Sequence, residues 1–185
     1  MNNVEEFLKS TLSAADSAAL RVLGGAVYPP RVLAGVRPQP VSAPPPAIDW
    51  PPERASRIFL IRHGEPIVAT SRFLPRRVRT SRGPLDVLAL AGVQTHPEFR
   101  GRGFGRAVVR AALAYVDRGI FDVSLFQTGV PEFYEKLACR RVSNPFTNAL
   151  AADPAGVPWW EHNIMIYPAE YPWPEGPIDL QGPGW

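Results

Sequence analysis

Apolar and polar positions alternate with two different periods along the chain, and these periods predict its elements. Residues 4–22 carry apolar side chains at three- and four-residue spacing, which predicts one amphipathic helix ended by Gly24-Gly25. Apolar runs at 58–62, 67–73 and 85–95 predict three strands, the first two paired antiparallel around a turn at 63–65. The third run is apolar on both faces, which is typical of a central strand.

The second half of the chain alternates between the two periods. Helical spacing over 103–118, followed by Gly119, predicts a helix, and 131–137 begins with proline and predicts a short one. Further strands are expected at 121–126, 141–150 and 163–167, with a short apolar piece at 31–36 as another candidate. Strands followed by alternating helices and strands predict a mixed α/β sheet with helices on both faces.

Proline dominates the composition, with 22 prolines and 15 glycines in 185 residues. A hydrophobic share of 45% is ordinary for a globular protein, so collagen, a coiled coil and whole-chain disorder are excluded. Only six prolines lie within residues 56–150, so the excess belongs to the flanks. We predict one domain in three parts: a helix and Pro-rich connector (1–55), a core (56–150) and a Pro- and Trp-rich extension (151–185).

The charge balance says little about partners. Lys and Arg number 20 against 17 Asp and Glu, a net charge of +3. All but two of the cations are Arg, which makes bidentate contacts with phosphate. The Arg-rich stretch at 72–82 lacks the interleaved aromatic residues that stack on bases, so no nucleic-acid partner is expected. Its side chains are expected as exposed loop charges, namely Arg76, Arg77, Arg79 and Arg82.

Several other sites are not expected. The one cysteine, Cys139, excludes an intrachain disulfide, and the three histidines lack metal-ligand spacing. The N-terminus lacks the pattern of a signal peptide, and no apolar run approaches the roughly 20 residues of a membrane span. We therefore expect no bound metal, no membrane contact and a cytoplasmic location.

The segment from Thr95 to Arg106 carries the strongest chemical signal. It joins an apolar strand to an amphipathic helix through glycines at 101, 103 and 105. Glycines let the backbone approach a ligand closely, and a helix start offers free N–H groups with a partial positive charge. This combination favours a pyrophosphate. A dinucleotide fingerprint would need glycine at Arg106, and a P-loop would need lysine after a glycine, so both are excluded.

Two motifs resemble those of the GNAT superfamily of N-acetyltransferases. Arg100-x-x-Gly103-x-Gly105 is similar to its R/Q-x-x-G-x-G/A motif, and residues 130–137 resemble its short helix ending in F/L-Y-E-K-L-G-F. The spacing between the two motifs leaves room for one helix and one strand, as in the family. The resemblance covers residues 56–150. It implies the acyl-CoA N-acyltransferase fold, with a largely antiparallel sheet and a splayed parallel pair of strands at the cofactor site.

The resemblance also implies a donor and its contacts. The family transfers an acetyl group from acetyl-CoA to an amine, here of a small molecule or a peptide. By position, the pantetheine arm is expected to pair with the backbone of Val93, Gln94 and Thr95, while the third strand and the strand from Phe121 splay apart. The remaining implied cofactor contacts, chiefly to the pyrophosphate, are Arg100, Gly101, Arg102, Gly103, Phe104, Gly105 and Arg106.

Tyr134 stands where the family has its general acid. A neutral amine attacks the thioester, and the departing thiolate, of pKa near 8.5, needs a proton that a tyrosine of pKa about 10 supplies. The sequence departs from the family pattern at two places: Gln127 replaces an asparagine, and Ala138-Cys139 replaces Gly-Phe. A left-handed conformation at Ala138 would cost roughly 1 kcal/mol more than at glycine.

The general base is left open by the sequence. Positions 89 and 91, where some relatives carry His or Glu, are both alanine. Water, Glu98, Glu161 and Asp86 remain as alternatives, and so does an acceptor that arrives neutral. His96 is expected at the edge of the pocket in a structural role.

In the family the acceptor pocket is built from the N-terminal helices and the last strands, where this chain departs most. Four of the five tryptophans lie in the tail and are expected to pack it onto the core. The tail resembles aminoglycoside 2′-N-acetyltransferases distantly, and a homodimer contact through it stays open. The alternative to an enzyme is a catalytically weak acyl-CoA-binding module or sensor.

Overall fold

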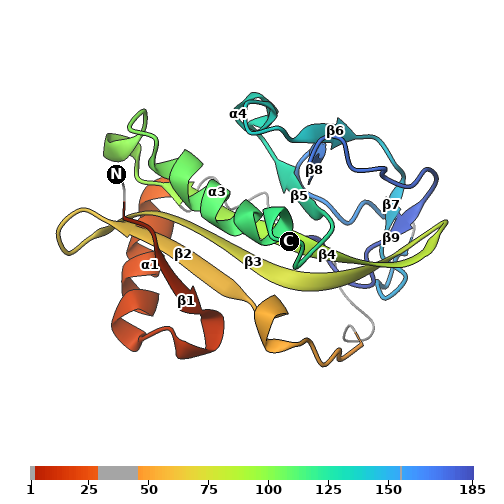
Figure 1. Cartoon of the computed structure of the whole chain (residues 1–185), viewed down its shortest axis with the longest axis horizontal. Coiled ribbons are helices and arrows are strands. Elements are labelled where there is room, and N and C mark those ends of the chain that lie inside the picture. Colours follow the sequence, from red (N-terminus) through yellow and green to blue (C-terminus); the bar gives the residue numbers. More distant parts are fainter. Residues whose placement is uncertain (1–2, 29–45, 155) are drawn as a thin grey trace.

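A computed structural model describes residues 3–28, 46–154 and 156–185 (Figure 1). Within them nine strands form one sheet and three α-helices cover it. The strands are β1 (Glu5–Leu8), β2 (Arg57–Arg62), β3 (Ile67–Thr80), β4 (Gly83–Thr95), β5 (Ser124–Thr128), β6 (Arg140–Val142), β7 (Phe146–Thr147), β8 (Asn163–Tyr167) and β9 (Ile178–Asp179). The helices are α1 (Ala14–Val27), α3 (Phe104–Asp117) and α4 (Pro131–Glu135). The strand predicted at 31–36 and most of the proline connector lie outside the described residues.

The sheet is mixed, as the sequence predicts. Its order is β1-β2-β3-β4-β5-β8-β6, with β9 beside β3 and β7 beside β9. Neighbours along this order run antiparallel except β4 and β5, which are parallel, as is the short β7–β9 pair. The strand expected at 121–126 begins three residues later, and the stretch at 141–150 holds two short strands rather than one. The elements predicted at 58–62, 85–95, 103–118 and 163–167 are confirmed within a few residues.

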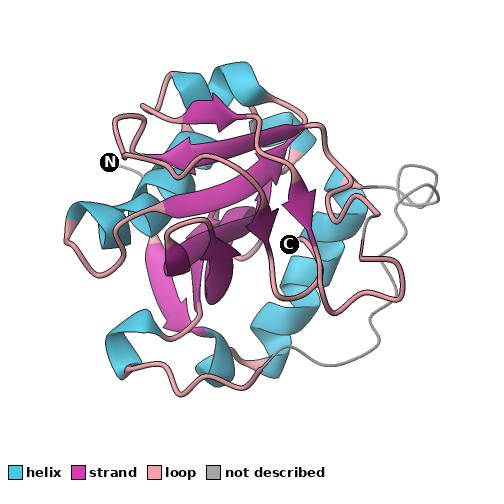
Figure 2. Ribbon diagram, turned by 90° about the vertical axis from the view of Figure 1, so that its right-hand side faces the viewer, coloured by secondary structure: helices cyan, strands magenta, loops and turns pink. Residues whose placement is uncertain are grey.

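The two faces of the sheet carry different cover (Figure 2). Alternate residues of β2 point to opposite faces, so Phe59 and Ile61 pack with α3 while Ile58 and Leu60 pack with α1. On the α1 side, the half of the sheet formed by β4, β5 and β8 is covered by the C-terminal tail. Both proline-rich flanks therefore contribute to the face opposite α3.

The N-terminal prediction of one helix over 4–22 is wrong. Residues 5–8 form a strand that pairs with the edge of β2, with Phe7 opposite Ile58. The helix begins only after Ser13, whose Oγ accepts a hydrogen bond from Asp16 N at 3.0 Å and so caps it. Apolar residues at 4, 7 and 8 have helical spacing, but the piece is short, and pairing with the main chain of β2 decides for a strand.

The glycine pair also does not end that helix. Gly24 and Gly25 lie within its last turn, where Tyr28 N donates to Gly24 O at 2.8 Å. A Cβ at Gly24 would stand 3.9 Å from the side-chain amide of Gln94. The absence of side chains at this point lets α1 approach the end of β4.

The Arg-rich stretch is mostly strand rather than loop, although Arg77, Arg79 and Arg82 are exposed as expected and only Arg76 is half-buried. It continues β3 to Thr80 in a long hairpin with β4. Arg77 Nε lies 2.6 Å from Asp86 Oδ1, while Arg76 donates to Leu180 O at 3.0 Å and stacks on Trp185. These partners lie up to about a hundred residues away, so local composition does not indicate them.

The tail packs onto the sheet as expected. Trp159, Trp173 and Trp185 are all buried against the β4–β5–β8 part of the sheet. Trp160 is the exception, with 46% of its surface exposed. Three of the four tail tryptophans therefore belong to the core.

Candidate functional site

β4 and β5 separate partway along their length. They pair only at Leu88 with Ser124 and at Ala89 with Leu125, although β4 continues to Thr95 and β5 to Thr128. Beyond these two pairs the facing edges diverge, which is the splay implied by the family resemblance. Unpaired main-chain groups at such an edge can bind an extended ligand in the manner of an added strand.

A β-bulge precedes the free end of β4. Arg72 pairs with Ala91 but Thr70 pairs with Gln94, so Gly92 and Val93 together lie opposite one residue of β3. Gly92 has φ +57°, and a Cβ there would stand 3.3 Å from Arg72 Nε. A bulge bends its strand and re-aims the groups that follow. Here those groups belong to the predicted contact residues Val93, Gln94 and Thr95.

The glycine-rich turn lies at the open end of the splay and leads into α3. A 3-10 turn over Pro97–Phe99 is followed by Gly101 and Gly103 with φ of +75° and +81°, a left-handed conformation that favours glycine. Gly103 caps α3, and no side chain bonds to the first amides of the helix. These amides remain available for an anion, as the sequence predicts.

The third glycine of the motif has a different role. Gly105 lies inside the first turn of α3, and a Cβ there would stand 3.0 Å from Thr95 Oγ1 and 3.9 Å from the ring of Phe133. Its small size seats the helix between the end of β4 and α4.

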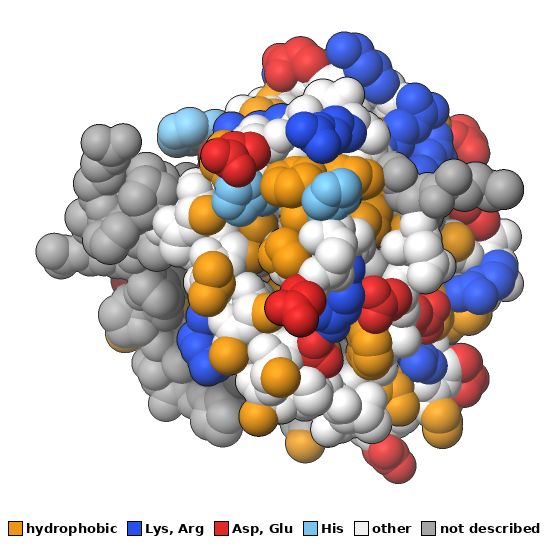
Figure 3. Space-filling view, turned by 90° about the vertical axis from the view of Figure 1, so that its left-hand side faces the viewer, with side chains coloured by type: hydrophobic (Ala, Val, Ile, Leu, Met, Phe, Trp, Pro, Cys, Tyr) orange, Lys and Arg blue, Asp and Glu red, His pale blue; other side chains and the backbone are white. Residues whose placement is uncertain are grey.

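An aromatic cluster packs around Phe99 in the glycine-rich turn. The ring of Phe99 lies 5.1 Å from that of His63 and 5.7 Å from that of His96, and the Arg102 guanidinium stacks on it at 4.9 Å. Figure 3 shows this end of the molecule, where hydrophobic side chains gather between histidines. His96 Nδ1 accepts from Glu98 N, which fits the structural role expected for it.

The arginines of the turn differ in the hydrogen bonds that their side chains make. Arg100 Nε donates to Thr95 O at 3.4 Å and Arg102 Nη2 to Glu98 O at 3.3 Å. Both bonds are long and exposed, so both guanidinium groups can turn toward a phosphate. Arg106 is exposed on the first turns of α3.

Tyr134 lies on α4 and is buried, with its ring 4.7 Å from Phe126 and 4.8 Å from Phe133. Its hydroxyl has no hydrogen-bond partner among the described residues. Burial raises the pKa of this phenol well above its ordinary value of 10.0, with smaller contributions from Cys139 and Tyr28. Tyr134 is therefore a protonated donor whose hydrogen is not committed elsewhere in the described chain.

The departure from the family pattern at Ala138-Cys139 follows this helix. Ala138 adopts φ +62°, so the left-handed conformation expected there is confirmed. Cys139 is 4% exposed, and burial raises the pKa of its thiol to about 12. The reactive form of this cysteine is thus suppressed.

The three acidic candidates for a base lie in different places. Asp86 is bound between Arg54 and Arg77 near the start of β4, away from the splay. Glu98 belongs to the glycine-rich turn. Glu161 lies at the end of β5, where a Cβ at Gly129 would stand 3.1 Å from its Oε2.

The Glu161 carboxylate has no hydrogen-bond or ion-pair partner among the described residues. Its backbone is held in place, because Glu161 N donates to Gln127 Oε1 at 2.9 Å. Its charge raises the pKa of Tyr28, after the larger effect of burial, and Tyr28 in turn affects Tyr134. The three groups thus gather at one end of the splay.

Two residues of this region have contacts that the sequence did not indicate. Tyr28 is the residue after α1, and its place beside Glu161 follows from the packing of that helix. Gln127 bonds to two parts of the tail at once, since Trp160 N and Glu161 N donate to its Oε1 while its Nε2 donates to Trp185 O. A longer side chain than asparagine is suited to this bridge.

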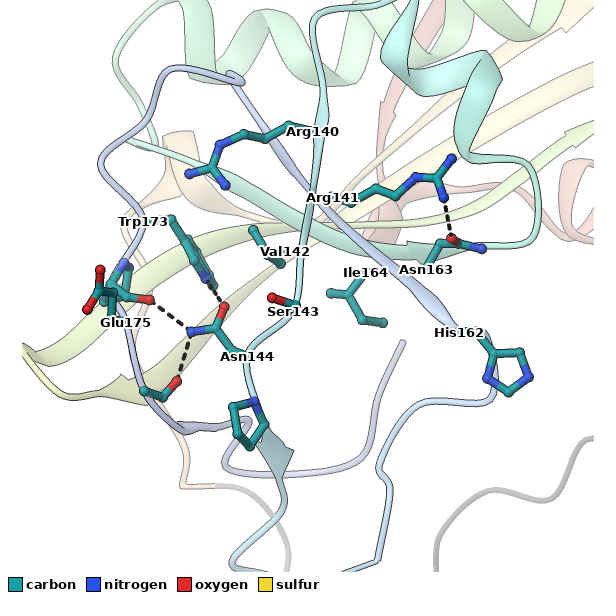
Figure 4. Close-up of a pocket in the computed structure, with 13 residues that line it drawn as sticks. Arg140, Arg141, Val142, Ser143, Asn144, His162, Asn163, Ile164, Trp173 and Glu175 are labelled. Atoms are coloured by element: carbon teal, nitrogen blue, oxygen red, sulfur yellow. Dashed lines mark hydrogen bonds between the residues drawn. The ribbon is translucent and has the colours of Figure 1, made fainter.

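A cavity of 720 Å³ lies elsewhere, at the β6–β8 edge of the sheet (Figure 4). Its polar groups bond to the protein itself: Asn144 Nδ2 donates to Pro174 O and Gly176 O, and Trp173 Nε1 donates to Asn144 Oδ1. Its lining includes none of the residues predicted to bind the cofactor or to act in catalysis.

Across residues 3–28, 46–154 and 156–185, His, Cys, Asp and Glu form no group of three that could hold a metal ion. In the same ranges no helix has the length and apolar character needed to cross a bilayer.

Known structures share the fold. ElaA from Escherichia coli is 19% identical, with 90% of this chain and 99% of that one covered at a TM-score of 0.56. An acyl-CoA N-acyltransferase from Pseudomonas aeruginosa is 14% identical, with the same coverage and a TM-score of 0.54. Some similar chains are longer: this protein spans 33% of an Enterococcus faecalis chain, which it matches at 13% identity with a TM-score of 0.54. No protein with a curated description matches.

The family itself is shown by the sequence match. The family model described as an acetyltransferase (GNAT) domain matches residues 43–141, more than half of the chain. That range contains the splay, the glycine-rich turn, α3 and α4. The distant likeness of the tail to aminoglycoside 2′-N-acetyltransferases is not supported by these comparisons. The chain belongs to the GNAT acetyltransferase family.

Proposed function

We propose that the protein transfers an acetyl group from acetyl-CoA to a primary amine of a small molecule or a peptide. Membership of the GNAT family supports acyl-CoA-dependent N-acyltransferase activity in general. The observation that carries the proposal is the splay between β4 and β5, which opens onto the uncapped start of α3. An extended arm with a pyrophosphate at one end matches this arrangement.

The donor binds along β4. Its pantetheine arm pairs with the backbone of Val93, Gln94 and Thr95, and its pyrophosphate binds the amides from Gly101 to Arg106. The side chains of Arg100, Arg102 and Arg106 lie around the same amides and can neutralise the phosphate charge. Support comes from the positive φ values of the turn and from the first-turn amides that no side chain caps.

The amine attacks the thioester carbonyl, and the oxyanion that forms accepts hydrogen bonds from the amides that follow the bulge. Such preorganised donors contribute about 2.7–4 kcal/mol each where they have been measured. The tetrahedral species then collapses, the C–S bond breaks, and the Tyr134 hydroxyl gives its proton to the leaving thiolate. The nitrogen, which carries a positive charge after the attack, loses one proton to form the amide, and this proton restores the Tyr134 hydroxyl directly or through solvent.

Burial matches this acid to its partner. The raised pKa of Tyr134 would make proton donation unfavourable toward a thiolate in water. A thiolate leaving beside Tyr134 is desolvated too, and burial raises the pKa of the neighbouring Cys139 thiol in the same way. The pKa values of the proton donor, Tyr134, and of the leaving thiol therefore shift in the same direction.

Glu161 serves as the base for the acceptor. Its carboxylate stands unpartnered in the described chain and lies near Tyr28 at the end of β5. An amine arriving as ammonium gives one proton to Glu161 and attacks in its neutral form. Of the three acidic alternatives, this is the one that combines a free carboxylate with a place at the end of β5.

The experiment is a panel of primary amines with acetyl-CoA, followed by thiol release and by mass spectrometry of the product. Turnover with at least one amine, and a product heavier by one acetyl group, is the expected result. Tight binding of CoA with no turnover on any amine would favour the alternative of an acyl-CoA-binding module.

A further inference from the structure

The indole of Trp185 occupies the closed end of the splay. Its Nε1 donates to Leu125 O at 3.0 Å, and Leu125 is the last residue of β5 that pairs with β4. Trp185 is 91 residues away from Gln94 in sequence, yet both lie along the same gap between two strands.

The hydrogen-bond pattern shows where this indole lies relative to the ladder. Leu88 N donates to Val123 O, so the carbonyls of residues 123 and 125 point toward β4. Ala89 with Leu125 is the last pair of the ladder, and the indole donates to the carbonyl of that same Leu125. The Trp185 indole therefore lies where the two strands begin to diverge.

Trp185 is held firmly in this place. Gln127 Nε2 donates to its carbonyl at 2.9 Å, the Trp159 ring meets it edge-on at 4.8 Å, and the Arg76 guanidinium stacks on it at 4.8 Å. The preceding Gly184 has no room for a side chain, because a Cβ would stand 2.5 Å from Pro158 O. The indole is 9% exposed and acts as a wall rather than as a mobile flap.

The direction of the donor brings its acyl group to this wall. The glycine-rich turn follows β4 directly, so an arm that starts there and pairs with Thr95, Gln94 and Val93 runs back along β4 toward Ala89. The acyl group is the end of that arm, and Ala89 and Ala91 lie in the same buried cluster as the indole. Each methylene beyond acetyl has to displace packed atoms.

Resting on the proposed function, we propose that the Trp185 indole is the end wall of the acyl site and restricts the donor to the shortest acyl groups. One methylene in an apolar pocket changes kcat/KM by about 10- to 200-fold. The wild-type protein should therefore prefer acetyl-CoA to butyryl-CoA by at least that factor.

The test compares acetyl-, propionyl- and butyryl-CoA as donors for Trp185→Ala, Trp185→Phe and Trp160→Ala. Trp160 is the matched control, because it lies in the same tail and is exposed. The expected result is that Trp185→Ala raises the butyryl-to-acetyl ratio of kcat/KM at least tenfold, that Trp185→Phe raises it less, and that Trp160→Ala leaves it unchanged. An unchanged ratio in a folded Trp185 variant that still uses acetyl-CoA would overturn the proposal.

A binding measurement separates this inference from the proposed function. Calorimetric dissociation constants for the three thioesters, measured without any amine, report the wall even if no acceptor reacts. If Trp185→Ala does not fold, Trp185→Phe keeps an aromatic ring in the cluster and still shortens the wall. If the wild-type protein binds all three thioesters equally, the proposed role of Trp185 as the end wall is wrong. Binding without turnover would contradict only the proposed function.

Discussion

Gly105 on α3 and Thr95 on β4 meet with no space for a side chain between them, since a Cβ at Gly105 would stand 3.0 Å from Thr95 Oγ1. The glycine therefore fixes the seat of the helix. Gly101 and Gly103 differ, because space around them is open and their positive φ is what favours glycine. One motif thus combines two requirements, close packing and backbone conformation.

Gly105→Ala should lower the free energy of unfolding by about 1–3 kcal/mol, the usual cost of overpacking. Thr95→Ala removes the opposing oxygen and should restore part of the loss in the double variant, as measured by urea unfolding. Gly101→Ala is the control: its cost comes from φ, so it should add to Thr95→Ala without coupling. Equal coupling in both pairs would contradict this division of roles.

Tyr134→Phe should lower kcat by about 10²- to 10⁴-fold, the range for a positioned general acid, with little change in acetyl-CoA affinity. Tyr167→Phe removes another buried hydroxyl, one that donates to Asp117 outside the splay, and should leave kcat almost unchanged. Because burial raises the pKa of Tyr134 above 10.0, the acid stays protonated below that pH. A loss of activity with rising pH that has its midpoint below pH 10, and that disappears in Tyr134→Phe, would argue against this raised pKa.

Glu161→Gln should lower kcat/KM for the amine and leave acetyl-CoA binding intact. The activity of the variant depends on the fraction of amine that is already neutral. This activity should therefore recover as the pH approaches the pKa of that amine. Glu170→Gln, an exposed change in the same tail, serves as the control. The same pH profile in wild type and Glu161→Gln would show that the proton leaves by another route.

Ala138→Gly should raise the free energy of unfolding by roughly 1 kcal/mol, because φ is +62° and an L-residue is strained there. Part of the gain is offset by the greater freedom of glycine in the unfolded chain. Ala18→Gly, on the exposed face of α1, should have the opposite sign, with a loss of about 1 kcal/mol. Thermal and urea unfolding of both variants check the pair.

Cys139 should resist alkylation by iodoacetamide in the native protein at about pH 8 and react fully in urea, since a protonated, buried thiol is inert. With a folded pKa near 12 against 9.0 for an ordinary thiol, its contribution to stability is complete below pH 9.0. That contribution declines between these two values, as the unfolded thiol ionises and the native one does not. Rapid native labelling would show that the site opens.

The elements around the donor were predictable because their signals are local. Helical periodicity sets α3, a proline at its start marks α4, and the apolar run of β4 needs no distant partner to be recognised. The N-terminal strand was not predictable in the same way, since Phe7 and its neighbours have helical spacing and only the pairing with the edge of β2 makes them a strand. The sequence likewise predicted Arg76 and Arg77 as loop charges, because it does not show their partners.

The sequence by itself determined the family, the glycine-rich turn and the short helix that carries Tyr134, because each motif depends on residues within a dozen positions of one another. Only the tertiary structure placed Trp185 at the closed end of the splay and Glu161 at the end of β5. Both positions depend on hydrogen bonds between Gln127 and a tail that follows about thirty to sixty residues later. Such contacts form only when the tail covers the sheet, and local composition carries no record of which strand it will meet.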